Sequence, residues 1–427
     1  EKAAAIQAAI ANSDGFYTTP VAAADRSKVN IPMRLKGNDE ALEAKFLTEA
    51  AAAGLLQLKG HRSVGGIRVS LYNANGLGAA QALVAFMNKF ASENGGKAAA
   101  AADAPAAGGE KYKVLVMDKC DPKAVAILTA AGHTAEEKEG LKEDELVKII
   151  PEYGAMIVRS ATTVTEPIIR AGKNLKIIGR AGVGVDNIKI PIATECGIHV
   201  VNSPQGNTIS AAEHTWGLIL AMARKVPQAY TKLKVEKVWD RKSFVGCELS
   251  GRTLAVLGFG NVGKTVGKFA LAFGMKVIAH DPFVSKEQGA KFGATMMELD
   301  ECLANGDVIT MHLPSIPSTQ KMINEKTIAT MKKGVMLANV GRGECVNDED
   351  LAAALKSGRV AAAALDVFAP EPLAADSPYY GCDNVVLTPH LGASTKEAQV
   401  KVAIDVSEQI CDVLAGGKPR TPVNKLA

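Results

Sequence analysis

Apolar and polar positions alternate in short runs, and the pattern before residue 95 predicts a small α/β unit. Two apolar runs, at residues 29–35 and 67–72, have the composition of strands. Two alanine-rich segments, at residues 39–53 and 78–90, are predicted to be helices. We therefore expect a first folded domain over residues 1–94.

A segment without large side chains follows this unit. Residues 95–109, GGKAAAAADAPAAGG, contain no large apolar residue that could fill a core, which is typical of a linker. The alanine run could form a helix, but Pro105 and the flanking glycines disfavour one. The sequence predicts an interdomain linker over residues 95–111.

After the linker, the chain alternates repeatedly between short apolar strands and helical segments, which is the pattern of a parallel sheet. A first series of strand candidates leads to a helix whose start, Ser210-Ala-Ala-Glu213, has the form of a capping box. A second series has six candidates, the number in a complete dinucleotide-binding sheet, so we predict an α/β fold with a Rossmann-type doubly wound sheet. The first series is 113–117, 155–159, 176–179 and 199–201, and the second is 253–257, 276–280, 307–313, 335–340, 360–367 and 384–387.

Composition excludes several classes of protein. Of the 427 residues, 47% are hydrophobic and 22% are charged, which is ordinary for a globular protein and not for a disordered chain. The net charge of +4 is too small for this length to indicate nucleic acid or a membrane surface as a partner. No apolar stretch reaches the roughly 20 residues of a membrane helix. The seven scattered cysteines include no C-x-x-C pair, which indicates reduced thiols, no metal site and a cytoplasmic location.

A glycine motif follows the first strand of the second series. The apolar run at 253–257 leads into Gly258-Phe-Gly-Asn-Val-Gly263, and a helical segment comes next. Gly258 permits a tight turn, Gly260 lets a pyrophosphate approach the backbone, and Gly263 lets the helix pack on the strand. Asp281, at the end of the next strand, suits the ribose hydroxyls of NAD and would repel the extra phosphate of NADP. The alternative is a glycine turn followed by a surface aspartate.

Three residues of suitable chemistry lie at or beyond the ends of late strands, where open α/β sheets bind ligands: Arg342, Glu371 and His390. Oxidation of a secondary alcohol requires removal of its hydroxyl proton, for which a histidine oriented by a carboxylate is suited. An arginine can hold a substrate carboxylate with two hydrogen bonds. Singly, the three could be an ion-pair residue, a solvated loop residue and a turn residue. Together they predict a dehydrogenase site.

These motifs carry a family resemblance. The chain resembles the NAD-dependent D-2-hydroxyacid dehydrogenases over about residues 112–427, and most of all the members that act on D-3-phosphoglycerate. The segments that carry the resemblance are 258–263 with Asp281, 339–343, 365–372 and 389–395 (PHLGAST).

The resemblance implies roles for these residues. His390 is expected to be the acid/base catalyst, Glu371 its partner and Arg342 the ligand of the substrate carboxylate. The resemblance also implies a flavodoxin-like substrate-binding domain, residues 112–205 and 393–427, interrupted by an NAD-binding domain at 206–392. The cofactor site is predicted to comprise Gly258, Gly260, Asn261, Val262, Gly263, Asp281, Pro314 and Asp366, the last near the nicotinamide amide.

A group upstream of the nucleotide domain suggests a phosphorylated substrate. Arg159 and Arg180 each follow a strand candidate, and Ser160, Gly182 and Asn207 could supply further donors. Two arginines with neutral donors suit a doubly charged phosphate, which favours 3-phosphoglycerate over glycerate or lactate. The alternative is a structural glycine turn with Arg159 in an ordinary ion pair.

The first domain has a resemblance of its own. The segment Gly60-His61-Arg62 to Ser70 is similar to the C-terminal small domain of the phosphoserine aminotransferases. That resemblance makes His61 and Arg62 a phosphate-binding pair and Arg68 the ligand of an α-carboxylate. The family places its Schiff-base lysine and pyridoxal phosphate cradle in a large domain, so we expect this piece not to transaminate alone. The alternative is a docking or solubility domain.

The expected function is therefore oxidation of D-3-phosphoglycerate by NAD, the first step of L-serine biosynthesis, in a fusion with part of the next enzyme. Alternatives are a glyoxylate or hydroxypyruvate reductase of the same family, or a non-catalytic NAD-sensing co-repressor. The resemblance implies a homodimer or higher homo-oligomer. Because the sequence starts at Glu1, we expect more chain upstream, whereas no serine-binding domain is expected after residue 414. The remaining histidines, His214 among them, show no partner pattern.

Overall fold

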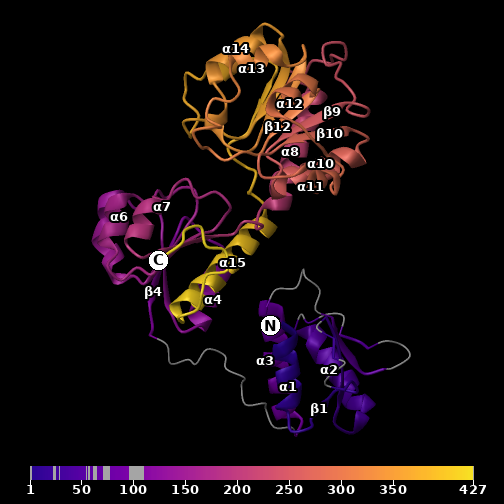
Figure 1. Ribbon diagram of the computed structural model, residues 1–427, viewed down its shortest axis with the longest axis vertical. Coiled ribbons are helices and arrows are strands. Elements are labelled where there is room, and N and C mark those ends of the chain that lie inside the picture. The colour runs from indigo at the N-terminus through magenta and orange to yellow at the C-terminus, as the bar shows by residue number, and fades with distance from the viewer. Residues whose placement is uncertain are drawn as a thin grey trace. The chain divides into compact units, whose positions relative to one another are not determined.

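The computed structural model describes residues 2–22, 26–27, 29–53, 55, 58–60, 65–70, 77–95 and 110–426. The chain divides into two compact units, Glu1–Gly109 and Glu110–Ala427, and each is described by itself (Figure 1). Residues 96–109 of the predicted linker lie outside the described residues. Among the described residues, no helix is both long enough and apolar enough to cross a membrane.

The first unit packs helices on a small antiparallel sheet around a core that includes Tyr17, Phe46 and Phe90. The pattern does not predict the first helix, because residues 2–11 are almost uniformly alanine and isoleucine and give no contrast between faces. The strands are β1 (Tyr17–Thr18), β2 (Asn30–Leu35) and β3 (Ile67–Ser70), with β2 in the middle, and the helices are α1 (Lys2–Ala11), α2 (Glu40–Ala52) and α3 (Leu77–Glu93).

The second unit opens with a five-stranded parallel sheet in the order β5-β4-β6-β7-β8. The edge strand β5 is absent from the predicted series, because its sequence TAEEK is polar and gives no apolar run. Its strands are β4 (Lys113–Met117), β5 (Thr134–Lys138), β6 (Ala155–Val158), β7 (Ile177–Arg180) and β8 (His199–Asn202), and its helices are α4 (Lys123–Ala130), α5 (Glu143–Ile149), α6 (Glu166–Ala171) and α7 (Ile190–Glu195).

The end of the chain returns to this first sheet. Helix α15 (Lys396–Leu414) lies along α4 and β7 (Figure 1). A Cβ at Gly179 would lie 2.3 Å from a methyl carbon of Val406, so glycine is what lets the helix approach the strand. Asn424 then fixes the last residues by accepting from the backbone N–H of Val200 at 2.8 Å and donating to the carbonyl of Ile198 at 2.9 Å. The core of the five-stranded sheet is therefore built from both ends of the unit.

Between these two segments lies a seven-stranded parallel sheet in the order β11-β10-β9-β12-β13-β14-β15. Six of its strands are the predicted second series, and the two-residue edge strand β11 is too short to be seen as a pattern. The strands are β9 (Thr253–Leu257), β10 (Lys276–His280), β11 (Thr295–Met296), β12 (Val308–Met311), β13 (Val335–Asn339), β14 (Val360–Leu365) and β15 (Val385–Leu387).

Helices cover both faces of this sheet, because alternate side chains of each strand are buried on opposite sides. Leu254 and Val256 of β9 belong to the core under α8 and α10, whereas Ala255 and Leu257 belong to the core under α12, α13 and α14. The predicted doubly wound α/β class is confirmed. The helices are α8 (Thr208–Ala223), α9 (Val226–Tyr230), α10 (Asn261–Ala272), α11 (Lys286–Ala290), α12 (Leu299–Asn305), α13 (Glu325–Thr330) and α14 (Asp348–Lys356).

The predicted capping box of α8 is wrong. The helix begins at Thr208, two residues before Ser210, and its N-cap residue Asn207 makes no side-chain capping bond. The Ser210 hydroxyl instead donates to the carbonyl of Gly392 at 2.8 Å. A tertiary contact with a segment 182 residues away therefore uses the side chain that the local pattern assigned to the cap.

Candidate active site

A cavity of about 800 Å³ lies within the second unit, at the carboxyl ends of strands from both parallel sheets. It brings together predicted catalytic, cofactor and phosphate residues that are far apart in the sequence. Gly258, Asp281 and Asp366 are predicted site residues outside its lining. The predicted residues that line it are Arg159, Ser160, Arg180, Gly182, Asn207, Gly260, Asn261, Val262, Gly263, Pro314, Arg342, Glu371 and His390.

The glycine motif forms a tight turn between β9 and α10. Gly258 has a φ of 87°, and a Cβ there would lie 2.5 Å from the carbonyl oxygen of His312. A Cβ at Gly263 would lie 2.1 Å from the carbonyl oxygen of Gly258, so a side chain would force the helix away from the turn. Space beside Gly260 is open, and this residue provides no side chain to cap the helix. The first N–H groups of α10 are thus left for a ligand.

Asp281 is tied to this turn. It follows β10 directly, and its Oδ2 accepts the backbone N–H of Phe259 at 2.8 Å. Its Oδ1 accepts the N–H of Phe283 at 2.9 Å. The predicted ribose-binding carboxylate is consequently held beside the predicted pyrophosphate turn.

His390 and Glu371 form a hydrogen-bonded pair, with 2.7 Å between Nδ1 of His390 and Oε2 of Glu371. The backbone N–H of Phe368 donates to the other carboxylate oxygen at 3.0 Å. Partial burial raises the pKa of Glu371, but the bonds from His390 and Phe368 outweigh burial and leave its pKa below the ordinary value of 4.5. The carboxylate is therefore ionised at neutral pH, and the second ring nitrogen of His390 remains for a substrate.

Asp366 is fully buried and binds the segment that carries His390. Its Oδ1 accepts from the His214 ring at 3.0 Å, the Thr388 hydroxyl at 2.6 Å and the N–H of Leu391 at 2.8 Å. Its Oδ2 accepts the N–H of Gly392 at 2.9 Å, and its carbonyl accepts the N–H of His390 at 2.8 Å. The structure thus ties Asp366 to five protein donors.

The expectation that His214 has no partner is wrong. His214 lies on helix α8, and its imidazole pairs with the carboxylate of Asp366. The signal in the sequence is its position. His214 is four residues from both Ser210 and Leu218, which are buried, so it shares their face of the helix. A histidine on a buried helix face needs a polar partner, although the pattern cannot say which one.

Arg342 has an acidic partner that the sequence did not indicate. Its Nε donates to Oδ2 of Asp186 at 2.9 Å, its Nη2 lies 2.8 Å from the same oxygen in an ion pair, and its Nη1 donates to the carbonyl of Gly341 at 2.7 Å. Asp186 belongs to the loop after β7, whereas Arg342 follows β13. The pair therefore joins the two parallel sheets across the cavity.

The two predicted phosphate ligands lie on the same cavity. Arg180 is half-buried. Its burial, and then the nearby charges of Arg342 and Arg159, lower its pKa to about 10, so it is charged at neutral pH. Its Nη1 donates to its neighbour's carbonyl at 3.0 Å, while its Nε and the Oδ1 of Asn207 are buried without a protein partner. Within the described residues, neither Arg159 nor Arg180 forms an ion pair. The ion pair considered as an alternative for Arg159 is absent there.

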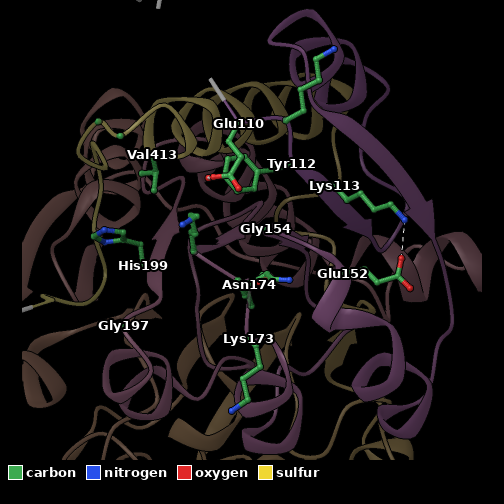
Figure 2. A pocket seen from close by; sticks show the side chains of 15 residues that line it. Glu110, Tyr112, Lys113, Glu152, Gly154, Lys173, Asn174, Gly197, His199 and Val413 are labelled. Carbon is green, nitrogen blue, oxygen red and sulfur yellow. Dashed lines mark hydrogen bonds and ion pairs between the residues drawn. The ribbon is translucent and has the colours of Figure 1, made fainter. Parts of the chain in front are cut away.

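A second cavity of about 830 Å³ lies at the amino ends of the strands of the five-stranded sheet (Figure 2). Two of the lysines that line it already have partners. Lys113 is 2.8 Å from Glu152, and the ammonium of Lys176 lies over the ring of Tyr112. Parallel sheets bind ligands at the opposite, carboxyl edge, so we place the active site in the first cavity.

In the first unit, only part of the predicted ligand set can be placed. His61 and Arg62 lie outside the described residues. Arg68 is half-buried on β3, and its Nε is buried without a hydrogen-bond partner among the described residues. No group of three or more His, Cys, Asp or Glu side chains that could hold a metal ion occurs in the described part of the chain.

The doubly wound sheet with its glycine turn is the fold of an NAD-binding domain. Residues 216–392 match the family model described as D-isomer specific 2-hydroxyacid dehydrogenase, NAD binding domain. A crystal structure from Thermus thermophilus is 34% identical, with a TM-score of 0.68 over 73% of this chain and 100% of that one. The chain belongs to the D-isomer-specific 2-hydroxyacid dehydrogenase family.

Relatives in this family carry a more specific name. The D-3-phosphoglycerate dehydrogenases of Synechocystis and Archaeoglobus fulgidus are 50% and 47% identical over 73% of this chain. The chain spans only 56% and 59% of their lengths, which is less than two thirds. An NAD⁺-bound 3-phosphoglycerate dehydrogenase from Entamoeba histolytica is 28% identical, with a TM-score of 0.64 over 74% of this chain and all of that one.

We predict that Asp366→Ala destabilises the nucleotide domain by about 3 kcal/mol or more, because it leaves several buried donors unpaired. Burial raises the pKa of Asp366, but bonds from His214, Thr388 and Leu391 outweigh it and leave the pKa below the ordinary 3.8. The stabilisation that the ionised Asp366 provides is complete above pH 3.8, and it is lost as the pH falls through the lower pKa of the folded state.

Urea unfolding of both proteins between pH 3 and pH 8 measures this effect. The stability difference from the parent should be constant at neutral pH and should shrink toward the acid end. Asp376→Ala, at an exposed position, is the control. Equal losses for the two variants, or a difference independent of pH, would contradict the structural role of Asp366.

Proposed function

We propose that this chain oxidises D-3-phosphoglycerate to 3-phosphohydroxypyruvate with NAD, the first step of L-serine biosynthesis. The observation that carries the proposal is the composition of one cavity of about 800 Å³. The cavity combines a histidine–carboxylate pair, a carboxylate-binding arginine and two further arginines without ion-pair partners among the described residues. The relatives named D-3-phosphoglycerate dehydrogenase support the same substrate.

The glycine turn and Asp281 suit NAD. A dinucleotide needs a helix start with free N–H groups and a turn whose backbone it can approach, and α10 and the open side of Gly260 provide both. We assign the pyrophosphate to the motif from Gly258 to Gly263, with Asn261 and Val262 on the helix start and Pro314 on the facing wall. Asp281 is assigned to the adenosine ribose. Bound NAD supplies the acceptor for the hydride that leaves C2 of the substrate.

His390 is the proposed base. Its Nδ1 is engaged by Glu371, so Nε2 takes the proton of the 2-hydroxyl as C2 is oxidised. Glu371, ionised at neutral pH, stabilises the imidazolium that results and fixes the ring's orientation. Arg342 binds the substrate carboxylate. We further propose that Asp366, near the nicotinamide amide in the resembled family, acts here mainly by holding residues 388–392 in place.

The distal phosphate is assigned to the substrate-domain side of the cavity. Arg180 and Arg159 provide charge, and Ser160, Asn207 and the backbone at Gly182 line the same wall. The buried Nε of Arg180 has no protein partner among the described residues. Because buried donors nearly always have a hydrogen-bond partner, this supports a bound phosphate as the acceptor. A substrate without a phosphate would leave this positive charge uncompensated.

NADH formation across 3-phosphoglycerate, glycerate and D-lactate tests the proposal. We expect kcat/KM for 3-phosphoglycerate to exceed that for glycerate by about a hundredfold or more, because two charge-assisted contacts are at stake. A preference for glycerate, or for glyoxylate in the reverse direction, would favour the reductase alternative. NAD binding without turnover of any of these compounds would favour an NAD-sensing co-repressor.

We also propose that the first unit is the C-terminal small domain of a phosphoserine aminotransferase, fused to the enzyme that makes the preceding intermediate. The buried, unpartnered Nε of Arg68 supports a site for an acidic ligand there. His61 and Arg62 are assigned to its phosphate. The lysine and cofactor cradle of that family belong to its large domain, so this unit should not transaminate alone. A cytoplasmic location would suit both enzymes.

A homodimer is proposed from one surface segment of the nucleotide domain. Residues 226–245, comprising α9, the helical turn Thr231–Val235 and the loop that follows, expose a concentration of large apolar side chains. Clustered exposed apolar residues usually mark an interface, and the family resemblance makes a second copy the expected partner. The side chains are Val226, Tyr230, Leu233, Val235, Val238, Trp239 and Val245.

We expect Trp239→Glu to weaken the dimer and shift the sedimentation coefficient of the full chain toward the monomer value. Trp239 is 78% exposed in one copy, so the substitution should not disturb the fold of the monomer. Phe283→Glu is the control, because Phe283 is 89% exposed but lies outside the segment. Unchanged sedimentation of both variants, or a monomeric parent protein, would contradict the proposed interface.

A further inference from the structure

We propose that Asp186 is the positioning residue for Arg342, holding one edge of its guanidinium group so that the remaining donors meet the substrate carboxylate. The inference rests on the proposed function, because it needs a substrate with a carboxylate. It gives Asp186, on the substrate-domain side of the cavity, a role in holding the arginine that binds the substrate carboxylate.

The hydrogen bonds of Arg342 leave a defined pair of donors. A guanidinium has five N–H groups. Nε donates to Oδ2 of Asp186, Nη2 is 2.8 Å from the same oxygen in the ion pair, and one N–H of Nη1 is bound to the carbonyl of Gly341. These contacts leave at least one N–H on each terminal nitrogen for a ligand. Two neighbouring donors match the two oxygens of a carboxylate.

The loop that presents Asp186 is itself fixed. The side-chain amide of Asn187 donates to the carbonyls of Arg159 at 2.7 Å and Thr162 at 2.6 Å. At Gly184, a Cβ would lie 1.7 Å from Nη2 of Arg342, so the guanidinium occupies the place of the missing side chain. Asp186 and Gly184 together form a seat for Arg342 on the opposite wall of the cavity.

Asp186 also offsets the positive charge of the arginines around it. Arg159 and Arg342 are both close enough to Arg180 to lower its pKa, and like charges favour separation. Asp186 lies among these charges and acts in the opposite sense on Arg180. Without its carboxylate, repulsion would drive the exposed end of Arg342 away from the other two arginines. The substrate carboxylate would then meet a mobile partner.

Two simpler roles for the same ion pair predict different kinetics. If Asp186 merely competes with the substrate for Arg342, its removal lowers KM and leaves kcat unchanged. If the ion pair only ties the two sheets together, removing Asp186 loosens the whole cavity, so the affinity for NADH falls together with that for the substrate. A positioning role predicts a loss that is confined to the substrate, leaves NADH affinity unchanged and depends on Arg342.

A double-mutant cycle of the full chain with Asp186→Asn and Arg342→Ala separates these three roles. We expect Asp186→Asn alone to raise KM for 3-phosphoglycerate and to lower kcat/KM by about tenfold or more, with NADH affinity unchanged. In the Arg342→Ala background it should have almost no further effect. Gly184→Ala, which displaces the guanidinium without changing charge, should reproduce the loss. Asp144→Asn, on the exposed side of α5, is the matched control.

A lower KM in Asp186→Asn, or losses that multiply independently in the double variant, would overturn the inference while leaving the proposed function intact. A parent protein that oxidises no 2-hydroxy acid would overturn the proposed function and this inference together. Unchanged kinetics in both Asp186→Asn and Gly184→Ala would remove the seat from the mechanism.

Discussion

The buried carboxylate of Asp366 is the group on which the arrangement of the active-site cavity depends. It lies directly after β14 and gathers hydrogen bonds from His214 on α8, from Thr388 and from the backbone after it. A buried charge with so many donors is stable only in one arrangement of those donors. The turn that carries His390 is thereby fixed, and the histidine is held within hydrogen-bonding distance of Glu371.

Parallel sheets impose the second constraint. All strands of the two larger sheets run parallel within their sheet, so their carboxyl ends collect loops at one edge. The chain enters the first sheet, crosses to the second and returns with α15, which brings both edges to one cavity. This topology brings residues as distant as Arg159 and His390 to the lining of one cavity. The ion pair between Asp186 and Arg342 bridges the same gap.

The sequence predicted most strands and the separate site residues because strong local signals mark them: apolar runs, the glycine turn, and polar residues at strand ends. It could not predict the contacts between distant segments. Ser210 looks like a helix cap but bonds to Gly392, and His214 shows no partner because Asp366 is 152 residues away. Asp186 lies in a glycine-rich segment, and nothing in that segment indicates its pairing with Arg342, which is 156 residues away. The edge strand β5 was missed because its sequence is polar. It forms a strand through backbone pairing with β4, which leaves no apolar run in the sequence.

We propose above all that the cavity is built for a substrate with a phosphate at the end opposite its carboxylate. The most direct measurement is the ratio of kcat/KM for 3-phosphoglycerate to that for glycerate, in the parent and in Arg180→Met. If Arg180 binds the phosphate, the ratio should fall by at least about tenfold, with little change for glycerate. An unchanged ratio, or an equal loss for both substrates, would contradict the account.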